Sequence, residues 1–228
     1  MELIGGYTIQ PATEADIPTL TDFLVKSKRH LAINRFLFIH WPAEEDQHAN
    51  YGTAVRGGIT DPDISSLKVV HTNTNRTVAY LVVARSGRPE TPRQVGNEES
   101  QRQRKEAENR RDLTGVINPA VVEAVNDAFK QLGIPEGEYL EIKYIYVEPS
   151  SRRLGIGTQL VRQCLDRANW ERLPLTINAE PNHHDWFLRR GFVDVCAVDI
   201  DLRAFAPRDS GYGPFRISRM ALRRNGLW

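Results

Sequence analysis

The segment from residue 139 to residue 168 constrains the fold of this chain more than any other part of it. Residues 139–147 alternate in polarity and are rich in β-branched and aromatic side chains, which predicts a strand that Pro149 ends. A turn with Gly155 and Gly157 follows, and beyond it apolar residues recur at helical spacing. A strand that passes through a short glycine turn directly into a helix requires helices packed on a sheet.

Similar patterns elsewhere predict one sheet that helices interrupt. Alternating or β-branched runs predict strands at residues 7–10, 67–71, 78–84, 175–179 and 192–202, with a last edge strand at 217–223. Helical spacing predicts a helix that Thr13 caps, and further helices at about 43–56, at 119–132 and at 182–190. Glycines at 57–58, at 133 and at 191 are expected to end the last three.

Residues 86–112 do not share this patterning. They carry charges of both signs and two prolines, and Val95 is their one aliphatic residue larger than alanine. Such a segment has almost nothing to bury. We therefore expect a mobile charged insertion within a single domain that spans residues 1–228, rather than a boundary between two domains. A basic tether for an acidic partner is the alternative.

Charge and cysteine content argue against several classes of protein. The chain has 30 Lys and Arg residues against 29 Asp and Glu, a net charge of +1, so no overall charge draws it to nucleic acid or to an anionic membrane. No run of residues is apolar enough to span a membrane. The two cysteines, Cys164 and Cys196, have the spacing of neither a disulfide framework nor a metal-ligand pair. The cytoplasm is the expected location, with the nucleus left open.

The turn between residues 147 and 158 has the composition of a phosphate-binding loop. Its glycines let the backbone come close to an anion, and the first N–H groups of the following helix have no partner within the helix. Arg152 and Arg153 add positive charge. The loop lacks the Gly-Lys-Ser/Thr of a Walker loop, and Leu160 stands where a dinucleotide fingerprint needs glycine. From these residues alone, a purely structural turn stays an open alternative.

Taken with its surroundings, the loop resembles that of the GNAT superfamily of acetyl-CoA-dependent N-acyltransferases. The pyrophosphate loop of that family reads Gln/Arg-x-x-Gly-x-Gly/Ala, and Arg152, Gly155 and Gly157 stand at its fixed positions. Three further segments are similar to family motifs, namely Pro11-Ala12-Thr13-x-x-Asp16, Tyr144-Ile145-Tyr146-Val147-x-Pro149 and Gly191-Phe192. The acidic strand at 198–202 and the segments around Tyr212 and Met220 look most like fungal members.

The resemblance implies a single α/β (α+β) domain with a central mixed, mostly antiparallel sheet flanked by helices. It implies acetyl-CoA as co-substrate, with no metal, and a pantetheine arm that lies where the strands at 139–147 and 175–179 part. A main-chain group of Ile145 is implied as a contact of the acetyl carbonyl, where a backbone N–H also serves as oxyanion donor. The implied cofactor-binding residues are Tyr146, Val147, Arg152, Arg153, Leu154, Gly155, Ile156, Gly157 and Thr158.

The implied reaction needs a proton acceptor, because at neutral pH only about one alkyl amine in a thousand is unprotonated. By the resemblance, Glu141 falls where histone-acetylating members place a catalytic glutamate. Glu148 and Glu180 are lesser candidates. The alternative for Glu141 is an ion pair with Lys143, which alternation along a strand puts on the same face.

A proton donor for the leaving thiolate is less well marked. Many family members have a tyrosine four residues before the Gly-Phe pair, and this chain has Phe187 there. Water, His183, His184 or Tyr212 are substitutes, and a thiolate can also leave without a dedicated acid. His183, His184 and Asp185 are not expected to hold a metal, because neighbouring residues on a helix point about 100° apart.

We therefore expect an N-acetyltransferase that moves an acetyl group from acetyl-CoA to a primary amine. A small-molecule acceptor is expected, because no accessory module or concentrated charged surface is visible. A protein lysine or N-terminal acetyltransferase is one alternative, and a non-catalytic acyl-CoA-binding module, favoured by Phe187, is the other. Nucleic acid and membranes are not expected partners, and a homodimer is compatible with the sequence.

Overall fold

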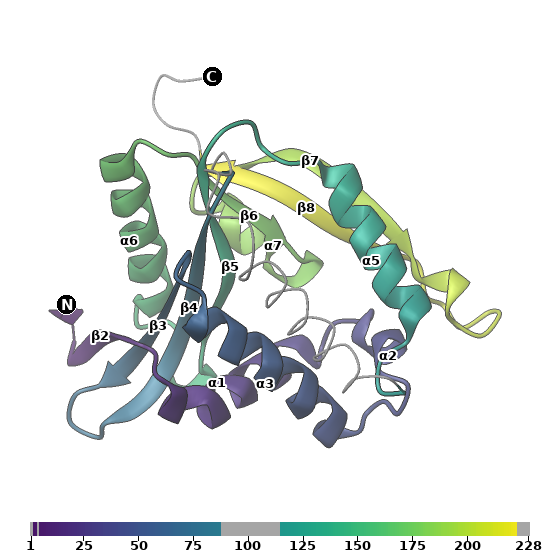
Figure 1. The fold of residues 1–228 in the computed structure, drawn as a ribbon, viewed down its shortest axis with the longest axis horizontal. Helices are drawn as coiled ribbons and strands as arrows, with labels where there is room; N and C mark the ends of the chain where they lie inside the picture. Colours follow the sequence, from purple (N-terminus) through teal and green to yellow (C-terminus); the bar gives the residue numbers. More distant parts are fainter. Residues whose placement is uncertain (1, 4, 88–114, 223–228) are drawn as a thin grey trace, which may run out of the picture.

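The structure, a computed structural model, describes residues 2–3, 5–87 and 115–222. The insertion expected at 86–112 lies outside the described residues, apart from Ser86 and Gly87. The described chain forms one eight-stranded sheet in the order β1-β2-β3-β4-β5-β6-β8-β7 (Figure 1). Within the described ranges β5 and β6 are parallel and the other neighbours are antiparallel. The mixed, mostly antiparallel sheet flanked by helices is thus confirmed.

The elements have the following bounds. The strands are β1 (Glu2–Leu3), β2 (Tyr7–Pro11), β3 (Ile64–His71), β4 (Arg76–Ser86), β5 (Tyr139–Val147), β6 (Leu175–Ala179), β7 (Phe192–Asp201) and β8 (Pro214–Leu222). The helices are α1 (Ile17–Lys28), α2 (Asn34–Leu37), α3 (Glu44–Thr60), α5 (Pro119–Leu132), α6 (Ile156–Glu171) and α7 (Pro181–Leu188). Short 3-10 turns lie at η1 (Glu14–Asp16), η2 (Pro149–Ser151) and η3 (Leu202–Ala204).

Two predictions about these elements were wrong. The glycine pair at 57–58 does not end α3, which continues to Thr60. Gly58 is buried, and a Cβ atom there would lie 3.3 Å from the Ser66 hydroxyl oxygen, so this glycine serves close packing of the helix on the sheet rather than helix termination. The last strand is not an edge strand, because β8 pairs with both β6 and β7 and leaves β7 at the edge.

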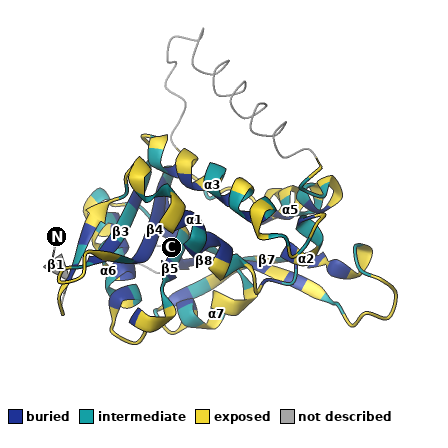
Figure 2. Ribbon diagram, turned by 90° about the horizontal axis from the view of Figure 1, so that it is seen from below, coloured by how far each residue is buried: buried dark blue, intermediate teal, exposed yellow. Residues whose placement is uncertain are grey.

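The helices cover the two faces of the sheet as separate groups (Figure 2). On one face α6 and α7 bury Leu160 and Phe187 against Ile142 and its neighbours. On the other face α1 and α3 pack over Tyr80, and α5 packs over β7 and β8. Removal of these apolar surfaces from water is the main force that holds the layers together. The loop before α6 is thereby fixed at one end of β5.

A β-bulge in β5 decides which of its side chains reach which face. Val82 and Val83 of β4 pair with Tyr144 and Ile142, so Lys143 has no opposite residue. The extra residue reverses the alternation. Ile142 and Ile145 consequently both pack on the α6 side, while Tyr144 turns to the α1 and α3 side.

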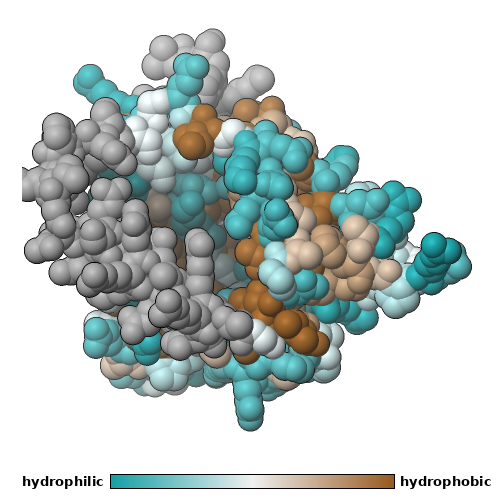
Figure 3. All heavy atoms as spheres, turned by 45° about the vertical axis from the view of Figure 1, so that its right-hand side comes forward, coloured by the Kyte–Doolittle hydropathy of each residue, from teal (hydrophilic) through white to brown (hydrophobic). Residues whose placement is uncertain are grey.

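Some apolar side chains are exposed to solvent. Figure 3 shows the side that carries α5 and β7, where hydrophilic side chains surround hydrophobic patches. Phe129 on α5 and Val195 on β7 are exposed apolar side chains of this region. The structure contains one chain, so the homodimer stays a prediction. Across the described ranges, no helix combines the length and the apolar character that a membrane crossing requires.

Candidate active site

The site is built around a gap between two parallel strands. β5 and β6 pair only through Leu140–Ile142 and Leu175–Ile177. Beyond these residues β5 stays with β4 up to Val147, whereas β6 stays with β8 up to Ala179. The two strands therefore part, as expected from the sequence, and their main-chain groups on the inner side are left without a neighbouring strand.

The main chain of β5 presents alternate residues to this gap. The N–H of Glu148 donates to the carbonyl of Val78 on β4 (2.8 Å). Because the main-chain groups of an antiparallel strand alternate between its two sides, Ile145 and Val147 face the gap and Tyr146 faces β4. The ring of Tyr146 lies in the apolar cluster under α1 and α3. The main-chain groups of Ile145 and Val147 thus border the gap and those of Tyr146 do not, and the contacts of all three with the cofactor stay predictions.

The loop from β5 to α6 ends in free amide groups. Arg153 and Gly155 have positive φ angles of 64° and 80°, so the chain turns sharply before the helix begins. The helical hydrogen bonds start with Gln159, whose N–H donates to the Gly155 carbonyl (3.0 Å). Among the described residues, none accepts a hydrogen bond from the N–H groups of residues 153–158. These N–H groups are therefore open to an acceptor, and anion binding at the start of α6 stays a prediction.

The arginines of this loop do not all point to that anion site. The Nε of Arg152 donates to the Val147 carbonyl (2.9 Å), and its guanidinium lies 5.7 Å from the centroid of the Tyr146 ring. Arg152 thus closes the turn onto the end of β5. Arg153 and Leu154 are exposed on the loop and Thr158 lies near its end, while Ile156 is buried under it.

A cation that the motif does not contain reaches the loop from the turn after α7. The Nη2 of Arg190 donates to the Thr158 hydroxyl (3.0 Å), and its Nη1 donates to the Trp186 carbonyl (2.8 Å). The guanidinium stacks on the Trp186 ring at 3.3 Å from the centroid. Its Nε is buried and has no hydrogen-bond partner among the described residues. Burial, with the nearby charge of Arg189, lowers the pKa of Arg190. No sequence pattern assigned this residue, because only the fold brings residue 190 next to residue 158.

A Cβ atom added at Gly157 would point into a narrow space between α7 and β5. That atom would lie 3.1 Å from Cζ2 of Trp186 on α7 and 3.6 Å from Cγ2 of Val147 on β5. The φ angle of Gly157 is not positive, so its backbone does not demand glycine. Glycine is needed here because β5, α6 and α7 meet at this point.

The candidate base Glu141 lies on the α1 and α5 side of the sheet, beside the closed end of the gap. Its side chain is 7% exposed, and its Oε2 forms an ion pair with Lys143 Nζ (2.6 Å). Asn178 on β6 donates to its Oε1 (2.9 Å) and in turn accepts from Arg219 on β8 (3.0 Å). The ion pair considered as an alternative is therefore present. Both carboxylate oxygens thus have partners among the described residues.

The other candidate acids and bases each have a partner or are replaced by a buried residue. Glu148 is paired with Arg76 and Glu180 with Lys28. Phe187 is 1% exposed and packs in the core against Phe192, so the usual position of the acid carries no titratable group. Tyr212 accepts a hydrogen bond from Arg35 (3.1 Å). These contacts leave no dedicated acid assigned by the geometry.

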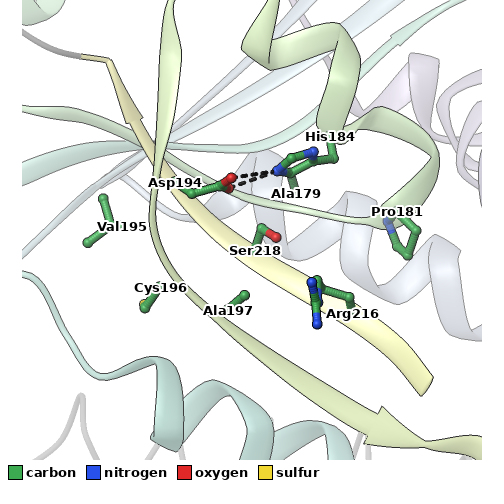
Figure 4. Close-up of a pocket in the computed structure, with 9 residues that line it drawn as sticks. All are labelled: Ala179, Pro181, His184, Asp194, Val195, Cys196, Ala197, Arg216 and Ser218. Carbon is green, nitrogen blue, oxygen red and sulfur yellow. Dashed lines mark hydrogen bonds and ion pairs between the residues drawn. The ribbon is translucent and has the colours of Figure 1, made fainter.

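A separate cavity of about 350 Å³ lies on the other side of α7 (Figure 4). His184 points from α7 toward Asp194 on β7, with Nε2 at 2.8 Å from Oδ1, and Asp194 raises the pKa of His184. Arg216 is paired with Asp199. None of the residues that line this cavity belongs to β5 or to the loop at Gly157. In the described part of the chain, no cluster of His, Cys, Asp and Glu has the makings of a metal site.

Comparisons with known proteins identify the arrangement. The family model of the acetyltransferase (GNAT) domain matches residues 118–194, which contain β5, the loop, α6, β6 and α7. A histone acetyltransferase HPA2-related protein from Corynebacterium glutamicum has 15% identity and a TM-score of 0.60, with 96% of each chain covered. A putative arylalkylamine N-acetyltransferase 7 from the yellow fever mosquito has 16% identity and a TM-score of 0.59, with 95% of this chain and 87% of that chain covered.

A plant structure has the same fold. NAA60 from Arabidopsis thaliana, in complex with a bisubstrate analogue, has 11% identity and a TM-score of 0.51, with 94% of this chain and 96% of that chain covered. No curated protein matches the sequence closely enough to count as a relative. At these identities the solved structures establish the fold, and the family model establishes the domain type over the residues that form the loop and the gap.

Proposed function

We propose that this chain, whose residues 118–194 match the acetyltransferase (GNAT) domain, transfers an acetyl group from acetyl-CoA directly to the primary amine of a small molecule. The observation that carries this proposal is the row of free N–H groups at residues 153–158 beside the gap between β5 and β6. A diphosphate at the start of α6 would accept hydrogen bonds from these groups and would lie at the positive end of the helix dipole. The pantetheine arm would then enter the gap along β5.

The main chain of β5 holds the reacting end in this proposal. Ile145 and Val147 present their main-chain groups to the gap. The Val147 carbonyl already accepts from Arg152, so Val147 offers its N–H. The N–H of Ile145 is the proposed donor to the thioester oxygen and to the oxyanion that forms when the amine attacks. The bond from carbon to sulfur then breaks, and the sulfur leaves as a thiolate.

Glu141 is the proposed acceptor of the amine proton. It lies on the face of the sheet opposite α6, beside the closed end of the gap, and this is the face from which the amine would enter in this proposal. Lys143 is 46% exposed, so its ammonium can move into water when an acceptor arrives. Asn178 would keep the carboxylate in place during this change.

A small acceptor is favoured over a protein because α1 is fastened across the open end of the gap. Ser27 at the end of α1 and Tyr144 share a hydrogen bond of 2.9 Å, which joins α1 to β5. A peptide would require a longer open groove than a small amine.

The test is release of free thiol from acetyl-CoA with a panel of alkylamines, arylalkylamines, lysine peptides and N-terminal peptides. We expect turnover with simple amines and little with peptides. Turnover with peptides alone would instead support a protein acetyltransferase, which the similarity to the HPA2-related protein and NAA60 keeps as the second candidate. Binding of acetyl-CoA without turnover on any acceptor would show a non-catalytic acyl-CoA-binding module.

Arg190 provides a separate test of cofactor binding. We propose that its guanidinium, with the unpartnered Nε, contacts the cofactor phosphates next to Thr158. Arg190→Met keeps the aliphatic stem over Trp186, and we expect about 10-fold weaker acetyl-CoA binding by calorimetry, the loss of roughly one charged hydrogen bond. Arg189→Met removes the same charge from an exposed neighbour and should change the affinity less than about twofold. Equal losses in both variants would reduce the effect to general surface charge.

A further inference from the structure

A set of charged groups at the open end of the gap has no part in the reaction as proposed above. Glu180 directly follows β6, and its side chain is 21% exposed. It forms an ion pair with Lys28, the last residue of α1. The Lys28 ammonium also lies over the ring of Tyr144, 5.9 Å from its centroid. We call Lys28, Tyr144 and Glu180 the ammonium cluster.

The position of the ammonium cluster relates it to the acceptor. Tyr144 lies on β5 beyond the last residue that pairs with β6, and Glu180 lies beyond the end of β6. The cluster therefore stands where the gap is open. It lies on the side covered by α1, because α6 and α7 occupy the other side. An amine that approaches the gap from this side comes within reach of the cluster.

The groups of the cluster are suited to bind a cation that keeps its proton. A carboxylate and the face of a tyrosine ring are groups that together hold an alkylammonium ion. Burial favours a higher pKa for Glu180, but the charges of Lys28 and His183 outweigh it and lower the pKa to about 2. Near neutral pH this carboxylate is therefore a weak proton acceptor. It can hold a cation but is poorly suited to remove the proton of the reacting amine, which leaves that step to Glu141.

The Lys28 ammonium can be replaced beside Glu180 by the ammonium of another molecule. The Lys28 side chain is 24% exposed and extends from the end of a helix, so its ammonium can turn into water while its stem stays on the protein. Replacement of one primary ammonium by another leaves the charge of the cluster unchanged. A monoamine gains nothing from this exchange once its single nitrogen is at the thioester. An amine with a second cationic group can fill both positions.

This inference rests on the proposed function. We propose that Glu180 and Tyr144 bind a second positive charge of the acceptor, and that Lys28 fills this position until the acceptor displaces it. The acceptor class is then a diamine or another alkylamine with a second cationic group. Glu180 acts in this scheme as a specificity-determining residue, because it distinguishes acceptors that carry the same reacting amine.

The test compares kcat/KM for putrescine and for butylamine, which share their chain length and reacting amine. We expect the wild-type protein to prefer putrescine by about 10-fold or more, mainly through KM, the effect of one charged hydrogen bond. In Glu180→Gln the ratio should fall close to one. In Lys28→Met the KM for putrescine should fall several-fold, because the competing ammonium is gone. Lys26→Met, at an exposed position of the same helix, should keep the wild-type ratio.

Each measurement tests a different part of the proposal. A wild-type protein without preference, or an equal loss of both acceptors in Glu180→Gln, would overturn the second-charge position. An unchanged KM for putrescine in Lys28→Met would overturn the exchange. If Glu180→Gln does not melt cooperatively, Lys28→Met decides alone, because water can reach Glu180 in that variant. Acetyl-CoA binding with no thiol release from either amine would instead reject the proposed function.

Discussion

Gly157→Leu is expected to abolish measurable binding of acetyl-CoA while the fold is kept. A Cβ atom at this position already lies 3.1 Å from Trp186, and the remaining carbons of leucine would fill the space between Trp186 and Val147 where the cofactor is proposed to enter. Overpacking of this kind costs about 1–3 kcal/mol in a core. Because the cofactor would compete for the same space, we expect at least about 100-fold weaker binding by isothermal titration calorimetry.

Gly57→Leu is the matched control for this experiment. Gly57 is exposed in α3, and a Cβ atom there would meet nothing within 4 Å. The control should bind acetyl-CoA as the wild-type protein does. A Gly157→Leu variant with wild-type affinity would show that the diphosphate does not approach the start of α6, and the proposed site would have to be abandoned.

Glu141→Gln is expected to lower kcat by about 100-fold, the size usually found when a general base is removed. The affinity for acetyl-CoA should stay nearly unchanged, because Glu141 lies on the side of the sheet away from the loop. Glutamine keeps the acceptor for Asn178 but cannot take up a proton. The measurement is the dependence of kcat on pH, in which the limb that reports the base should disappear.

Glu138→Gln makes the same change just before β5, at a carboxylate that is paired with Arg85. Its pH profile should match that of the wild-type protein. If Glu141→Gln also keeps a wild-type profile, the ion pair with Lys143 is structural, and Glu141 has no part in proton transfer.

The local elements followed well from the sequence. β5 and β6 have the predicted bounds because alternation and β-branched residues mark buried strands, and α5 begins at the predicted cap, where the Asn118 side chain accepts from the N–H of Ala120 (3.1 Å). The loop was also recognisable, since paired glycines between a strand and a helix indicate a sharp turn or a close approach to the backbone. These features depend on neighbouring residues and therefore leave a local signal.

The features that were missed depend on residues far apart in the chain. Arg190 meets Thr158 only because α7 packs beside α6, and Lys28 meets Glu180 only because α1 crosses the gap. The central place of β8 also has no local signal, because the pairing of a strand is decided by its partners. The contact of Glu141 with Lys143 was foreseen as an alternative, since both lie on one strand.

The short paired segment of β5 and β6, which we call the seam, divides the sheet into two parts. Strands β1 to β5 form one slab and β6, β8 and β7 form the other, and the ladder that joins the two slabs has three residue pairs at the base of the seam. A molecule bound between them would take the place of a missing strand and would join the two slabs. Saturation with such a molecule should therefore raise the melting temperature of the whole protein.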